Sequence, residues 1–438
     1  MPVTWHADLA WLGDAPAANV LITVDGGRFT AVEPGVPRPP GVERLRGLTL
    51  PGLANAHSHA FHRALRGRTH TGRGTFWTWR EQMYAVAERL TPSLYLKLAR
   101  AVFAEMALAG VVCVGEFHYL HHGPGGQRYD DPNEMGTALI EAAAQAGIRI
   151  TLLDTCYLTA SVAGAALEGP ALRFGDGSAA AWASRAALLA PAAHARIGAA
   201  VHSVRAVPAD QISEVVAWAS AREAPLHVHL SEQRAENEAT AVVHGRTPTE
   251  LLAGAGALGP RSTVVHATHL TGSDVETLGA TRTHTCLCPT TERDLGDGIG
   301  PAAALAAAGS PLCVGSDSHA VIDLLEEARA VELHERLRTE HRGHFPAEQL
   351  LRAATTGGHA SLGWDDAGTI TVGARADLVT VTLDSARTAG IDPAGVVFAA
   401  TAADVTDVIV DGERIVHNGR HLRVDVTGEL REAITWLF

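Results

Sequence analysis

The feature that most constrains the fold of this chain is a repeated alternation, after Pro51, of short apolar runs with Ala-rich stretches. In stretches such as SLYLKLARAVFAEMALAG, apolar residues recur with a spacing near 3.6, which indicates helices that pack one face on a sheet. Eight β/α units up to about residue 365 predict a closed parallel barrel, an α/β fold of the (β/α)8 TIM-like type, rather than a doubly wound sheet. The strand-like runs are LTLPGLANAHSH, VVCVGEFHYL, IRITLLDTCYL, ARIGAAVHSVRAV, PLHVHLSEQ, STVVHATHL, THTCLCPTTE and PLCVGSDSHA.

The two ends of the chain carry a different pattern. Residues 1–50 and 367–438 contain short alternating strands separated by Gly and Asp turns, as in ANVLITVDGGRFTAV and DVIVDGERIVHNG. We expect these segments to pair into one small composite β-sandwich domain. The barrel of residues 51–366 would then be inserted between its two halves.

Composition limits the partners and the compartment. The formal net charge is −13, which argues against nucleic acid and acidic membrane surfaces as partners. No apolar run reaches the roughly 18 residues of a membrane span, and the N-terminus has no signal-peptide pattern, so we expect a cytoplasmic protein. The five scattered cysteines suit buried thiols better than disulfides. Cys286 and Cys288 could bind metal, but their i, i+2 spacing on a strand favours core packing.

Polar residues stand at the ends of most of the predicted strands. In a parallel barrel these ends and the loops after them form the catalytic face, so the side chains are expected to converge on one axis. They are His57, His59, Glu116, His118, Tyr119, His202, Arg205, His227, His229, Glu232, His266, Asp317 and His319.

The histidine pattern suggests a metal site. His57 and His59 are two residues apart, so on a strand both imidazoles point the same way and can share a metal ion. Two solvent-exposed histidines at a strand end would give the same sequence pattern. A histidine of the fifth strand and Asp317 would complete a set suited to Zn²⁺ or Fe²⁺; spacing alone does not choose between His227 and His229. A metal-bound water can reach a pKa of about 7 and so supply hydroxide. Hydrolysis also needs a proton carrier.

The strand-one H-x-H, the strand-five H-x-x-E, the strand-six histidine and the GSD that ends strand eight resemble the amidohydrolase superfamily, in its mononuclear aminohydrolase branch. The resemblance implies a barrel joined to a small β-sandwich and one divalent metal ion, Zn²⁺ ahead of Fe²⁺. No lysine follows strand four to bridge a second metal. The implied metal ligands are His57, His59, His229 and Asp317, and the implied proton carriers are Glu232, His266 and Asp317.

A narrower resemblance rests on NAHSHAFHRALRG, GTFWTWREQMY, GEFHYLHH, HSVRAV and LGDGIGPA. These segments are similar to superfamily members that hydrolyse N-formimidoyl-L-glutamate to N-formyl-L-glutamate and ammonia in histidine degradation. The two carboxylates of such a small-molecule substrate call for guanidinium or hydroxyl partners in a partly desolvated pocket. The resemblance also implies a homodimer. The implied substrate-binding residues are Arg205, Arg80, Tyr119, His202 and His62.

Other interpretations stay open at this point. A purine, pterin or triazine deaminase of the same branch would bind a planar ring by stacking, and ring opening as in imidazolonepropionase is also hydrolytic. A non-catalytic barrel would serve only as a binding protein, but it is expected to lose ligands that are all present here. Arg80 could be a surface helix residue, and Tyr119 and His202 could make ordinary strand-end hydrogen bonds.

Overall fold

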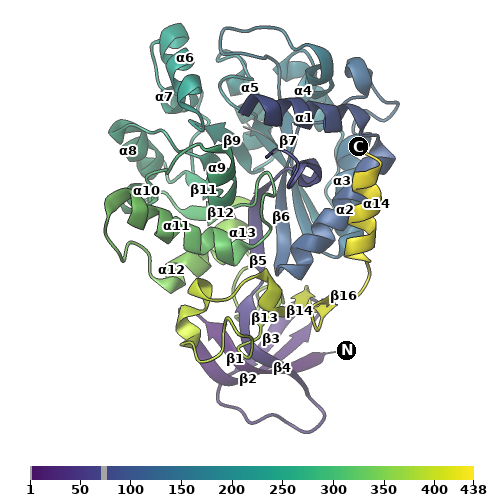
Figure 1. Ribbon diagram of the computed structural model, residues 1–438, viewed down its shortest axis with the longest axis vertical. Coiled ribbons are helices and arrows are strands. Elements are labelled where there is room, and N and C mark those ends of the chain that lie inside the picture. The colour runs from purple at the N-terminus through teal and green to yellow at the C-terminus, as the bar shows by residue number, and fades with distance from the viewer. Residues whose placement is uncertain (1, 71–75) are drawn as a thin grey trace.

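A barrel and a separate β-sheet lie end to end in the computed structural model, which describes residues 2–70 and 76–438 (Figure 1). Residues 74 and 75, the start of the GTFWTWREQMY segment, lie outside the described residues. Both ends of the chain contribute to the sheet, and the N-terminus lies at the sheet end of the molecule (Figure 1).

In the described part of the chain, all eight predicted strand-like runs form parallel strands of one sheet, hydrogen-bonded in chain order. The sheet closes where Asp317 N donates to His57 O (3.0 Å) and His59 N donates to Asp317 O (3.1 Å). The predicted barrel is therefore confirmed. Its strands are β5 (Leu53–Ser58), β6 (Val111–His118), β7 (Arg149–Cys156), β8 (Ala195–Val201), β9 (Leu226–Leu230), β10 (Ser262–His266), β11 (His284–Leu287) and β12 (Leu312–Val314).

The closing strands approach each other closely because Gly315 has no side chain. A Cβ at Gly315 would lie 2.8 Å from the Cβ of His57 and 2.9 Å from its backbone nitrogen. Such a contact is too short for any other residue without a backbone shift, so glycine at this position permits the seam. The seam also brings Asp317, two residues later, beside His57 and His59.

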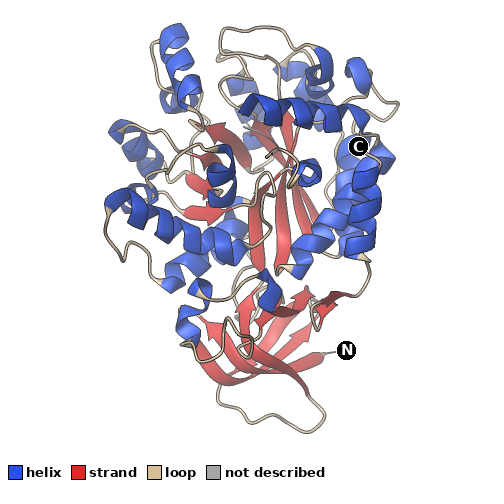
Figure 2. Cartoon of the chain, in the orientation of Figure 1, coloured by secondary structure: helices blue, strands red, loops and turns tan. Residues whose placement is uncertain are grey.

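Helices surround the barrel strands, as Figure 2 shows. Local signals set some of their ends: Thr91 Oγ1 accepts a hydrogen bond from Leu94 N at the start of α2, and Gly147 ends α3 in the left-handed region. The helices are α1 (Phe76–Arg89), α2 (Pro92–Leu108), α3 (Glu134–Ala146), α4 (Ala179–Ala186), α5 (Ile212–Ala221), α6 (Arg234–His244), α7 (Pro248–Gly254), α8 (Gly272–Ala280), α9 (Pro289–Leu295), α10 (Ala302–Ala308), α11 (Leu324–Thr339), α12 (Ala347–Arg352) and α13 (Gly358–Ser361).

The terminal segments form one mixed sheet of eight strands within the described residues. Strand β4 from the first segment pairs with β13 from the second, with Leu50 opposite Val379. The prediction that both ends of the chain build one small β-domain is therefore confirmed, and its described strands form one continuous sheet. Trp5, Ile22 and Phe29 lie in its own apolar core. The strands are β1 (Val3–Leu12), β2 (Ala15–Asp25), β3 (Arg28–Glu33), β4 (Glu43–Pro51), β13 (Leu378–Val381), β14 (Val405–Val410), β15 (Glu413–His417) and β16 (Arg420–His421).

Buried charges join the two parts. Arg149, at the start of β7, forms an ion pair with Asp377 beside β13 and a second one, at 3.1 Å, with Asp411. The last helix, α14 (Val426–Thr435), lies against barrel helix α2, where Arg100 Nε and Glu429 Oε2 are 2.8 Å apart (Figure 1). We propose residues 51 and 366 as the boundaries between the barrel and the terminal β-domain.

The cysteines behave as the sequence predicts. All five are buried free thiols, and Cys286, Cys288 and Cys313 pack with Ala56 and Val265 inside the barrel. Among the described residues, no helix combines the length and the apolar character that crossing a membrane requires.

Candidate active site

The four predicted metal ligands meet at the carboxyl end of the barrel. His57 and His59 come from the end of β5, His229 from β9, and Asp317 from the segment after β12. One side-chain ligand atom from each residue lies within 4.8 Å of the others, and all four residues are buried. Asp317 Oδ1 is 3.4 Å from His57 Nε2 and 3.3 Å from His59 Nε2.

Hydrogen bonds behind two of these histidines fix which nitrogen faces the centre. His59 Nδ1 donates to Phe117 O, and His229 Nδ1 donates to His202 O, each at 2.9 Å. Because a carbonyl oxygen can only accept, each Nδ1 carries the proton, and in the neutral ring Nε2 turns a lone pair toward the centre. Nε2 of His229 is 3.1 Å from Nε2 of His57, beside the Asp317 carboxylate. Converging lone pairs and a carboxylate fit a divalent cation.

His227 takes no part in this cluster. Its Nε2 donates to Ser361 O at 2.9 Å, inside the barrel. The H-x-x-E spacing of the sequence, rather than the H-V-H pair itself, therefore selects the histidine that faces the centre.

Unusual backbone conformations hold several side chains of the catalytic face. Ser231, His266 and Asp317 all have positive φ, at 51°, 70° and 42°. L-residues rarely adopt this left-handed region, and the strain is stored where surrounding structure fixes the chain. Here the barrel seam fixes Asp317, and its carboxylate is thereby aimed between the cluster and His266.

Three carboxylates surround His266 at the edge of the cluster. Nε2 of His266 is 3.7 Å from Asp317 Oδ2 and 4.0 Å from Glu232 Oε1. Its Nδ1 lies 3.3 Å from Glu292 Oε1, an acceptor that sequence reasoning missed. Burial opposes a charged ring, but the acidic neighbours outweigh it and raise the pKa of His266 to about 10. Burial in turn raises the pKa of Glu232, which favours the form that carries a proton.

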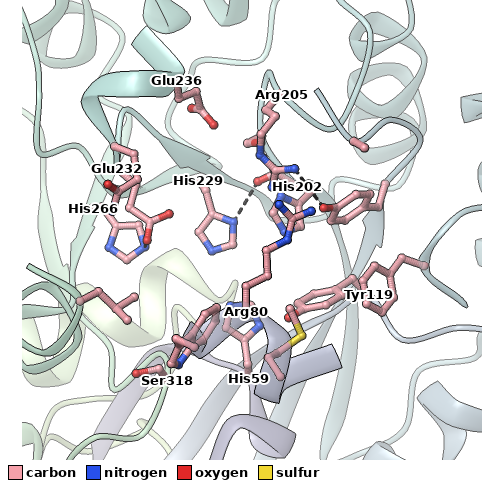
Figure 3. Close-up of a pocket in the computed structure, with 18 of the residues that line it drawn as sticks. His59, Arg80, Tyr119, His202, Arg205, His229, Glu232, Glu236, His266 and Ser318 are labelled. Atoms are coloured by element: carbon pink, nitrogen blue, oxygen red, sulfur yellow. Dashed lines mark hydrogen bonds and ion pairs between the residues drawn. The ribbon is translucent and has the colours of Figure 1, made fainter. Parts of the chain in front are cut away.

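One cavity of about 440 Å³ opens over the cluster, and Figure 3 shows its lining. Except for His57, which is buried beneath it, every predicted site residue lines this cavity. In Figure 3, Glu232 and His266 lie on one side of His229, and Arg205 and Tyr119 lie on the other. The predicted residues on the cavity wall are His59, His62, Arg80, Tyr119, His202, Arg205, His229, Glu232, His266 and Asp317.

Aromatic hydroxyls accompany the two guanidinium groups. Arg205 Nη1 donates to the hydroxyl of Tyr157 at 3.0 Å, and Arg80 Nε donates to that of Tyr84 at 2.8 Å. Tyr119 OH lies 2.8 Å from His62 Nε2, which places His62 on the cavity wall rather than among the metal ligands.

Sequence reasoning missed several residues of the cavity wall. Tyr157 directly follows β7, so the strand-end rule could have found it. Glu236 lies four residues after Glu232, in the first turn of α6, and only the structure brings it into the cavity. The missed residues include Trp79, Tyr84, Tyr157, Phe174, Glu236 and Ser318.

A second buried cluster of histidine and aspartate lies at the ends of β6 and β7. His118, His121 and Asp154 also bring ligand-type atoms within 4.8 Å of one another. Here a cation is already present: Arg185 donates to both carboxylate oxygens of Asp154, each at 2.8 Å, and Trp182 Nε1 donates to Oδ1 at 2.7 Å.

A parallel barrel with three histidines and an aspartate beside a Glu–His pair defines a metal-dependent hydrolase. The chain belongs to the amidohydrolase family, whose model matches residues 48–415. It is 37% identical over 388 residues to the formimidoylglutamate deiminase of Pseudomonas aeruginosa, covering 86% of this chain and 85% of that protein. It is 28% identical to a 5-methylthioadenosine/S-adenosylhomocysteine deaminase of Halobacterium salinarum, covering 84% and 80%.

Solved structures show the same architecture. An amidohydrolase from Brucella melitensis is similar to this chain with a TM-score of 0.91 and 32% identity, covering 99% of each chain. A zinc-bound atrazine chlorohydrolase from Arthrobacter aurescens has a TM-score of 0.88 at 22% identity and 100% coverage of both chains, a likeness that shows the fold alone. The family and the His/Asp cluster together support a divalent metal ion.

Proposed function

We propose that this chain hydrolyses N-formimidoyl-L-glutamate to N-formyl-L-glutamate and ammonia, with one zinc ion held by His57, His59, His229 and Asp317. The observation that carries the proposal is a single cavity that joins the His/Asp cluster to two guanidinium groups, those of Arg80 and Arg205. The similarity to a formimidoylglutamate deiminase supports the same substrate.

The residues around the cluster suit a hydrolytic deimination. When bound, a zinc ion supplies a water molecule that loses a proton near neutral pH. Asp317 Oδ2 faces His266 and is placed to accept that proton. His266 donates a hydrogen bond that stabilises the charge developing at the reacting amidine carbon. Glu232 carries a proton to the departing nitrogen, so a C–O bond forms, the C–N bond breaks and ammonia leaves.

The far side of the cavity suits two carboxylates. The substrate is a diacid, and a carboxylate that leaves water needs charged or hydroxyl donors. Arg205 and Arg80 provide guanidinium groups, and Tyr119 and His202 lie next to them on the cavity wall. A neutral planar ring, as in a purine deaminase, carries no carboxylate for these two cations.

An ammonia-release assay of the zinc-loaded protein tests the proposal. We expect release from N-formimidoyl-L-glutamate, less from N-formimidoyl-L-aspartate, and none from guanine or cytosine. Arg205→Met should raise KM for the diacid by about 30-fold or more, because a charge-assisted contact is lost. Preference for guanine, or an unchanged KM in this variant, would reject the diacid assignment.

We also propose that the enzyme is a cytoplasmic homodimer. The five free buried thiols support a reducing compartment. The dimer rests on analogy with the family, and light scattering coupled to size exclusion tests it directly: a mass of one chain at micromolar concentration would reject it.

A further inference from the structure

Glu236 is a cavity residue to which the proposed reaction assigns no role. It lies in the first turn of α6 and lines the cavity. Ser203 and the backbone of Ser231 favour the ionised form of its carboxylate. Its Oε1 is buried and has no hydrogen-bond partner among the described residues. Because an acceptor without a partner is costly, a carboxylate on the wall of a binding cavity gains from a donor on the ligand.

The charges around Glu236 indicate that the donor on the ligand belongs to a cation. Arg205 attracts its negative charge from one side, and Glu232 repels it from the other. Burial, with Glu232 adding to it and Arg205 opposing, raises the pKa of Glu236 to about 7. A cation bound in the cavity next to the Glu236 carboxylate would favour the ionised form and gain a charge-assisted hydrogen bond.

The position of Glu236 matches one group of the proposed substrate. Figure 3 shows Glu236 between Glu232, at the hydrolytic end, and Arg205, at the carboxylate end. In N-formimidoyl-L-glutamate the nitrogen that bears the α-carbon lies between the reacting carbon and the carboxylates. That nitrogen carries an N–H and shares the positive charge of the formamidinium.

We propose that Glu236 is a specificity-determining residue that accepts the N–H of the α-nitrogen and makes the cavity select the cationic amidine over the neutral formamide product. The inference rests on the proposed function. Hydrolysis removes the positive charge from the group next to Glu236. The carboxylate then faces the product's own carboxylates and Glu232 and has lost the cation of the substrate, so the product is bound more weakly than the substrate and leaves.

The test compares substrate and product in wild type and Glu236→Gln. The amide keeps the shape and an acceptor oxygen but has no charge. We expect KM for N-formimidoyl-L-glutamate to rise about tenfold or more, and Ki for N-formyl-L-glutamate to stay the same or fall. The ratio of Ki to KM should therefore drop by at least about tenfold, with a smaller change in kcat.

Two control variants distinguish the effect of the Glu236 charge from a structural effect of the substitution. Glu238→Gln removes an exposed charge from the same helix and should leave the ratio unchanged. Glu236→Asp keeps the charge and should keep most of the preference for the cation, and it serves as the second variant if Glu236→Gln does not fold. Bound zinc and circular dichroism report whether each variant is intact.

The other outcomes reject either the role of Glu236 or the proposed function. A Ki/KM ratio that does not change in Glu236→Gln, or a rise of both constants by one factor, overturns the role of Glu236 while the deiminase activity stands. A wild-type Ki at or below KM overturns it as well. Absence of ammonia release by the wild type would instead reject the proposed function itself.

Discussion

Two buried clusters at the same end of the barrel have nearly the same composition and opposite electrostatics. In the first, His57, His59, His229 and Asp317 turn lone pairs and one carboxylate toward a common centre. In the second, the carboxylate of Asp154 lies among histidines but already accepts hydrogen bonds from Arg185 and Trp182.

The difference shows that residue types alone do not define a metal site. Arg185 also donates through Nε to Asp176, at 2.9 Å, so two buried aspartates share one fixed cation. Although burial opposes it, Arg185 lowers the pKa of Asp154. The pKa of Asp176 is lowered by the hydrogen bond with His122, then by His121 and Arg185. A metal ion would have to displace Arg185 from Asp154 there, whereas the first cluster, in the described structure, has no arginine or lysine bonded to Asp317.

The largest expected contrast is in metal content. Asp317→Asn should lose the bound metal and all measurable ammonia release, because the variant loses the carboxylate charge at the centre. Asp154→Asn, its matched control in the second cluster, should keep about one metal ion per chain. Elemental analysis of both purified proteins checks this; equal metal loss in the two variants would contradict the distinction between the clusters.

A substitution beside the first cluster should separate metal binding from catalysis. Glu232→Gln keeps all four ligands but cannot deliver a proton, so kcat should fall about 10²- to 10⁴-fold while the metal content stays at the wild-type level. Steady-state kinetics with elemental analysis measures both quantities. Full activity in this variant would remove Glu232 from the mechanism.

In the second cluster the main effect should be on folding. Arg185→Leu leaves two aspartates buried without their cation, and breaking such a pair typically costs about 3–5 kcal/mol of the free energy of unfolding. Urea denaturation of the metal-loaded proteins gives this value. Bound metal should remain stoichiometric in the folded fraction; a loss below 1 kcal/mol would mean that water reaches the pair.

The smallest expected effect is a pH dependence of stability. The pKa of His121 is lowered from 6.5 to about 4, mainly by burial and then by Arg185. The folded state therefore binds fewer protons than the unfolded state between these values, and stability present above pH 6.5 is lost as the pH falls toward 4. His121→Asn should lessen this acid loss by about 3 kcal/mol or less. Urea midpoints between pH 7 and pH 4.5 test it, and parallel curves for both proteins would contradict it.

Much of the first cluster was predictable because each of its residues ends a strand. The alternation of apolar runs fixes the number of strands, and the parallel arrangement brings His59, His229 and Asp317 to one face whatever the detailed packing. Glu236 and Glu292 were not predictable, since they lie on helices after the strands and reach the site only through the turn of the helix. The Asp154–Arg185 network joins a strand to a helix through side-chain packing, and no sequence spacing encodes that contact.

The closing seam has a consequence for how the enzyme is made. His57 and Asp317 lie side by side at the seam, where Gly315 packs against His57, but most of the barrel sequence separates them. A ribosome must therefore release nearly three quarters of the chain before the last ligand can reach the first two. Such a contact of very long sequence separation forms late in folding, because the intervening loop must first be ordered. Metal uptake by a nascent chain would thus report that the barrel has closed.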